Sequence, residues 1–92
     1  MIRPTVGRVV LFYKYVNGQG HKGPMAAHVA FVHSDSMVNL MVISENGLPS
    51  GFTSVELIQD DVNEPVPSSD YCTWMPYQKA VASGAQAPTL HA

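Results

Sequence analysis

The stretch Met25–Ser44, MAAHVAFVHSDSMVNLMVIS, decides the predicted fold. In each half, alternate positions share one face: Ala27, Val29, Phe31 and His33, and then Val38, Leu40 and Val42. Alternation with a period of two is typical of a β-strand with one face in the core. The Ser34-Asp35-Ser36 segment between the halves is typical of a turn. The sequence therefore predicts two strands, about Met25–His33 and Met37–Ser44, joined as a hairpin.

Two further strands are predicted on either side of this hairpin. Val6 to Tyr15 is rich in β-branched and aromatic residues, and Phe52 to Ile58 alternates in the same way. Glu45-Asn46-Gly47 predicts a tight turn, lengthened by the residues up to Gly51, because Asn and Gly accept the positive φ that such turns require. Three glycines and a proline in Val16–Pro24 predict a loop.

The end of the chain divides into three segments. Gln59 to Asp70 is acidic, contains two prolines and is predicted to be a connector. Tyr71 to Gln78 is aromatic and predicts a short final strand or a single helical turn that closes the core. From Lys79 to Ala92 the composition cannot offset the entropy of ordering. We therefore expect one domain over residues 1–78 and a flexible C-terminal tail over 79–92.

The strand pattern predicts the fold class. Four or five short strands without a long helix indicate an all-β protein, and their order fits a small SH3-like, partly open barrel of four to five antiparallel strands. Because a partly open barrel exposes strand edges, we also expect a homo-oligomer.

Composition excludes several classes of protein. The chain has 92 residues, of which 46% are hydrophobic and 13% charged, so it is too apolar for an intrinsically disordered protein. Its single cysteine excludes an internal disulfide and a cysteine-based zinc site. No apolar run approaches the length of a membrane span, so no membrane partner is expected. We expect a small soluble intracellular protein.

Charge is segregated along the chain. Up to Ser34 every charged residue is basic, and from Asp35 to Gln78 every one is acidic. Two interpretations remain open: early and late strands pair and mix the signs, or the basic third forms an anion-binding surface. A nucleic-acid groove is disfavoured, because such domains usually have a pI above about 9 and this chain has a pI of about 6.0. A bound anion would therefore be small.

The sequence contains no catalytic or metal-binding signature. The four histidines lack the spacing of a ligand set, since His28 and His33 lie on opposite faces of one predicted strand. Cys72 has no histidine base or orienting partner that the sequence identifies, and its aromatic neighbours suggest packing. We expect no catalytic residue, no metal, no cofactor and no enzymatic activity.

Two features could bind a ligand. The glycine-rich segment Gly18–Gly23 could cradle a phosphate with Lys22 supplying charge, or could be an ordinary flexible hairpin loop. The aromatic residues could fill the core, or could stack a base or grip a peptide beside basic side chains. Trp74 and Tyr77, on either side of Met75-Pro76, could form a flat apolar surface.

Four segments together resemble a group of small proteins encoded by tailed bacteriophages. They are Arg3-Pro4-Thr5-Val6-Gly7-Arg8-Val9-Val10, Met37-Val38-Asn39-Leu40, Thr53-Ser54-Val55 and Trp74-Met75-Pro76-Tyr77-Gln78. The resemblance covers about Ile2 to Lys79 and carries no established activity. It implies a protein made in the cytoplasm of an infected bacterium, where small β-proteins often sequester cyclic nucleotide immune signals or serve in the virion and its assembly.

These observations lead to a hypothesis about function. We expect a non-enzymatic protein that sequesters a small phosphate-bearing ligand, such as a cyclic nucleotide signal of the host. Cations would neutralise its phosphates, rings would stack its base, and two polar side chains would read the base edge. The predicted ligand-binding residues are Arg3, Arg8, Lys22, Tyr13, Tyr15, Asn39, Thr53, Trp74 and Tyr77. The alternative is a protein-interaction module, either a virion component or an inhibitor that docks on a host protein.

Overall fold

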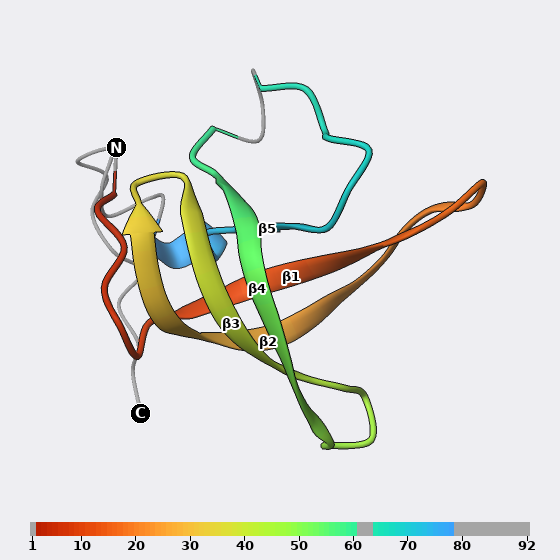
Figure 1. Cartoon of the computed structure of the whole chain (residues 1–92), viewed down its shortest axis with the longest axis horizontal. Coiled ribbons are helices and arrows are strands. Elements are labelled where there is room, and N and C mark those ends of the chain that lie inside the picture. The colour runs from red at the N-terminus through yellow and green to blue at the C-terminus, as the bar shows by residue number, and fades with distance from the viewer. Residues whose placement is uncertain (1, 61–63, 79–92) are drawn as a thin grey trace.

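A computed structural model describes residues 2–60 and 64–78, and within them five strands form one closed barrel (Figure 1). The strands are β1 (Val9–Val16), β2 (Gly20–Ser34), β3 (Met37–Ile43), β4 (Pro49–Ile58) and β5 (Tyr71–Thr73). From β1 to β4 each strand pairs antiparallel with the next. The predicted small all-β barrel is confirmed. The predicted tail, residues 79–92, lies outside the described residues.

Strand β5 closes the ring in a way that the sequence pattern did not predict. It pairs antiparallel with β1 and parallel with β4, so the barrel is closed rather than partly open. Parallel neighbours need a crossover of about a dozen residues, which is the length available between Ile58 and Tyr71. A closed ring also removes the free edges on which the expectation of a homo-oligomer rested.

The core is formed by the inward face of every strand. Val10 and Phe12 of β1 are fully buried, and the other buried core residues are Ala27, Val29, Val38, Leu40, Val42, Val55, Leu57, Cys72 and Trp74. The Phe12 ring packs on the Phe52 ring, with 4.8 Å between the centroids. The alternation predicted for residues 37–44 is confirmed, because Val38, Leu40 and Val42 are all buried in this core and the positions between them are not.

Two β-bulges change which side chains face outward. The register shifts between Val29 and Phe31, which leaves the Phe31 side chain 53% exposed although Ala27 and Val29, on the same predicted face, are buried. A second shift, opposite Asn39, turns Phe52 toward the core and Thr53 to solvent. Bulges of this kind increase local twist and curvature, which a small closed barrel needs. Period two alone does not show where such an extra residue falls.

The glycine-rich segment is a strand pair and not the predicted loop. The partners Lys14 with Lys22 and Val16 with Gly20 continue β1 and β2 into a narrow hairpin that projects from the barrel (Figure 1). Only the short turn 17–19 separates the two strands. At Gly23 the φ of 141° and a backbone contact both require glycine, since an added Cβ would lie 2.7 Å from the Phe12 carbonyl oxygen.

The chain end completes the barrel through both of the predicted elements. Strand β5 is followed by one helical turn at residues 76–78, and Trp74 between them is fully buried. The indole Nε1–H donates to Gln59 Oε1 at 3.1 Å. The Gln59 amide also binds both backbone groups of Ile2 and the carbonyl oxygen of Asp35. This one side chain therefore ties the N-terminal segment, the β2–β3 turn and the C-terminal segment together.

Candidate functional site

Groups that often carry catalysis are buried or dispersed in the described part of the chain. Burial, and then the charge of Glu56, raises the pKa of the Cys72 thiol to about 12, so it stays protonated and is not a nucleophile at neutral pH. Within residues 2–60 and 64–78, no three His, Cys, Asp or Glu side chains lie together as metal ligands do. No helix in these ranges has the length and apolarity needed to cross a membrane.

The structure does not gather the predicted cations in one place. Arg8 lies just before β1, and its guanidinium stacks 5.8 Å from the centre of the Trp74 ring while Nε–H donates to Thr5 Oγ1. Lys22 pairs across the hairpin with Lys14, which is six residues after Arg8 in the chain. At about 3.3 Å per residue this separates Arg8 from Lys22 by roughly 20 Å. Arg3, also exposed, lies in the segment before Arg8. A single phosphate cannot bridge such a distance.

The predicted rings are also dispersed. Trp74 is fully buried, so the prediction that it stacks a ligand base is wrong: its indole is needed to fill the core. The Tyr13 ring already stacks on Tyr71, at 4.8 Å and 12°. Tyr15 packs against His21 at 5.3 Å, on the opposite face of the hairpin from Lys22, because side chains alternate along a strand. Tyr77 is 52% exposed, on the helical turn.

The side-chain oxygen of Asn39 binds groups of the protein itself and is not free to recognise a ligand. Its Oδ1 accepts the backbone N–H of Ser54 at 2.8 Å and the Nε2–H of His33 at 2.8 Å. Ser54 has a φ of 54°, which is unusual for a residue other than glycine. The amide of Asn39 thus stabilises the bulge in β4. Thr53, next to it, is exposed and remains accessible.

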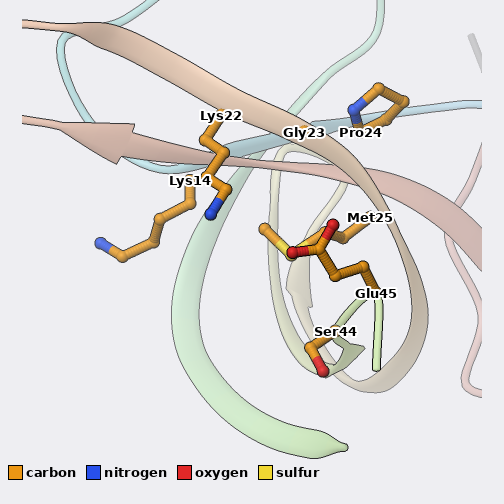
Figure 2. Close-up of a pocket in the computed structure, with 7 residues that line it drawn as sticks. All are labelled: Lys14, Lys22, Gly23, Pro24, Met25, Ser44 and Glu45. Atoms are coloured by element: carbon orange, nitrogen blue, oxygen red, sulfur yellow. The ribbon is translucent and has the colours of Figure 1, made fainter. Parts of the chain in front are cut away.

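A groove that the sequence did not predict lies where the hairpin joins the barrel (Figure 2). Its volume is about 380 Å³, and it is lined by Lys14, Lys22, Gly23, Pro24, Met25, Ser44 and Glu45. One wall belongs to the hairpin and the other to the turn between β3 and β4. Of the nine residues predicted to bind a ligand, only Lys22 lines this groove.

Local hydrogen bonds explain the shape of the second wall. Ser44 Oγ accepts the backbone N–H groups of Asn46 and Leu48, at 3.3 and 3.1 Å. The backbone N–H of Ser44 donates to the Leu48 carbonyl at 2.9 Å. This turn, which the Glu45-Asn46-Gly47 signal predicted, sets the backbone of Glu45 at the mouth of the groove. The sequence signal for the wall was therefore present, but nothing indicated what it faces.

The charged side chains of the groove differ in whether they have a partner of opposite charge. Lys14 and Lys22 are direct cross-strand neighbours, an arrangement in which like charges repel. Asp70 neutralises Lys14, with Nζ and Oδ1 3.1 Å apart, and also accepts the backbone N–H of Tyr15. Among the described residues, Lys22 and Glu45 form no ion pair, either with each other or with another side chain. Figure 2 shows the ammonium of Lys22 and the carboxylate of Glu45 both directed toward the space between the walls.

Comparison with known proteins adds no further constraint on this site. The sequence matches no family model, no curated protein and no solved structure. The resemblance to phage proteins therefore stays a prediction.

Proposed function

We propose that the chain is a non-enzymatic binding protein that captures a small ligand through an anionic group, phosphate or carboxylate, in the groove beneath the β1–β2 hairpin. One observation carries the proposal: the Lys22 ammonium points into a groove of about 380 Å³ and has no carboxylate partner among the described residues. An ammonium group is a compact charge that binds phosphate and carboxylate oxygens well.

The size of the groove limits the ligand. Pockets that enclose drug-sized ligands range from about 300 to 1,000 Å³, and this groove is at the lower end. It therefore suits a small ligand better than a cyclic di- or trinucleotide. Capture of a larger immune signal, in the cytoplasm of an infected bacterium, would need a second copy of the chain to bring Arg3, Arg8 and Tyr77 to the same ligand.

The test is an NMR titration of ¹⁵N-labelled protein with inorganic phosphate, adenosine monophosphate and a cyclic dinucleotide. We expect saturable shifts at Gly23, Met25 and Ser44 and a loss of affinity of about fivefold in Lys22→Met, the upper range for an exposed ion pair. Arg3→Met removes the same charge outside the groove and is expected to change nothing. No saturation with any probe up to about 10 mM, or an equal loss in Arg3→Met, would overturn the proposal.

A second candidate function, a protein-interaction module, is favoured by a different surface. On the outer face of β2, β3 and β4, Phe31 is 53% and Met41 40% exposed. The outward positions around these two residues carry no carboxylate, ammonium or guanidinium group: Ala26, His28, Ala30, His33, Asn39, Gly51 and Thr53. On this face of β4 a carboxylate comes only at Glu56, further along the strand and opposite Met37. A second copy of the chain suits such a face, because an isologous interface places the face against itself and no like charges meet.

Sedimentation equilibrium tests this second candidate. We expect a reversible dimer at tens of micromolar that Phe31→Glu converts to a monomer, because that variant brings two carboxylates together. Tyr77→Glu, an exposed aromatic position on the helical turn, is the control and should leave the dimer intact. A wild-type protein that is monomeric at 200 μM would remove the candidate.

A further inference from the structure

We propose that the groove selects a zwitterion, a small molecule whose anionic group meets Lys22 and whose cationic group meets Glu45. This inference rests on the proposed function and adds the chemical class of the ligand. It comes from the two charges of opposite sign that line the groove together, each without an ion-pair partner among the described residues.

The two groups come from segments that the fold holds in place independently. Lys22 is on β2 beyond the barrel, where pairing with Lys14 orients it onto the groove face. Glu45 is in the β3–β4 turn, whose backbone is held by the two bonds to Ser44 Oγ. No ion pair joins Lys22 to Glu45, so the groove stays open between them. A ligand that carries both charges would complete both pairs at once.

Between the charges the lining is largely apolar. Met25 and Pro24 contribute a thioether and a pyrrolidine ring. Lys14 contributes its aliphatic stem, because its ammonium is directed away toward Asp70 (Figure 2). A short methylene spacer between the two charged groups of a ligand would contact this lining. The arrangement therefore favours an ω-amino phosphate or an ω-amino carboxylate over inorganic phosphate.

The charge of Glu45 determines whether the groove prefers a zwitterion or a simple anion. A ligand with only an anionic group must approach the Glu45 carboxylate without compensation, so like-charge repulsion weakens its binding. A ligand with an added ammonium group turns the same carboxylate into an attraction. Removal of the Glu45 charge should then weaken zwitterion binding and strengthen anion binding, and a purely structural role of Glu45 would not produce opposite effects.

The experiment compares matched ligands on the full-length protein by NMR titration. O-phosphoethanolamine and n-propyl phosphate have the same size and differ in an ammonium group that replaces a methyl group, and β-alanine and butyrate form the same pair for carboxylates. We expect the wild type to prefer the zwitterion of at least one pair by about fivefold, as for an exposed ion pair. Glu45→Gln should abolish the preference and bind the simple anion about twofold more tightly.

A control and three outcomes make the test decisive. Asp35→Asn removes one negative charge in the β2–β3 turn, outside the groove, and should keep the preference. Equal affinity for both members of each pair, with Lys22-dependent binding, overturns the zwitterion inference alone. A preference that Glu45→Gln leaves intact also overturns it. Absence of binding by all four probes overturns this inference, and absence of binding by inorganic phosphate and the two nucleotides as well overturns the proposed function with it.

Discussion

The polar side chains of the barrel and those of the groove at the base of its hairpin differ in how far the fold supplies them with bonding partners. In the barrel, Asn39, Gln59 and Gln78 each bind several backbone or side-chain groups. No buried side-chain nitrogen or oxygen of the described residues lacks a partner. In the groove, Lys22 and Glu45 have no ion-pair partner among the described residues. A polar residue in a small domain is thus a better candidate for binding when the fold makes no use of it.

The largest expected effect breaks the barrel. Trp74→Ala removes a fully buried indole and the donor to Gln59 Oε1, so we expect the free energy of unfolding to fall by about 3–5 kcal/mol. Urea denaturation followed by circular dichroism measures this. Tyr77→Ala, three positions on and 52% exposed, should cost less than about 1 kcal/mol. Equal losses would show that the indole does not hold the chain end.

The next effect concerns the point where barrel and hairpin join. Gly23→Ala combines backbone strain with a Cβ placed 2.7 Å from the Phe12 carbonyl oxygen, and we expect a loss of about 3 kcal/mol. Gly47→Ala is the matched control, because its φ is also positive (81°) but an added Cβ meets nothing within 4 Å. It should cost about 1 kcal/mol. Similar values for the two variants would contradict the close approach.

A smaller effect tests whether Asn39 serves the fold. Asn39→Ala removes the acceptor that holds the Ser54 backbone, so urea denaturation should show a loss of about 1–2 kcal/mol. Asn39→Asp keeps an acceptor oxygen and should lose less. Thr53→Ala, an exposed neighbour on the other strand, should stay within about 0.5 kcal/mol of the wild type. If Asn39→Ala left the free energy of unfolding unchanged, the Asn39 amide would not serve the fold and would be available for a ligand.

The smallest expected effect on the free energy of unfolding is that of Lys22, in the groove. Lys22→Met should change the free energy of unfolding by less than about 0.5 kcal/mol, because Lys22 makes no ion pair with a described residue. Lys14→Met, directly opposite, breaks the bond to Asp70 and should cost up to about 1 kcal/mol. A clear destabilisation by Lys22→Met would show that its charge serves the fold and not a ligand.

The strands were predictable because their signal is local. The alternation in residues 37–44 and the Glu45-Asn46-Gly47 turn each depend on neighbours in sequence, and both are found in the structure. For the glycine-rich segment the local signal predicts a loop, because glycines and a proline usually interrupt strands. Here the segment is a strand nevertheless, because its backbone pairs across a narrow hairpin, as Lys14 does with Lys22.

The candidate site was less predictable because it depends on register and closure. Lys22 was identified from its charge, but Glu45 was not, since its position opposite Lys22 depends on how the β3–β4 turn meets the hairpin. The sequence cannot separate a ligand-binding role of Trp74 and Asn39 from a structural one, because indole and amide groups suit both recognition and packing. Only burial and hydrogen-bond partners distinguish these two uses.

By itself the sequence determined the all-β class, most of the strands, the Glu45-Asn46-Gly47 turn and the segregation of charge, because periodicity and turn chemistry act over a few neighbouring residues. The tertiary structure alone decided the closure through β5, the bulges and the groove with Lys22 and Glu45. These features join residues far apart in the chain, and such contacts depend on strand register and on the filling of one shared core.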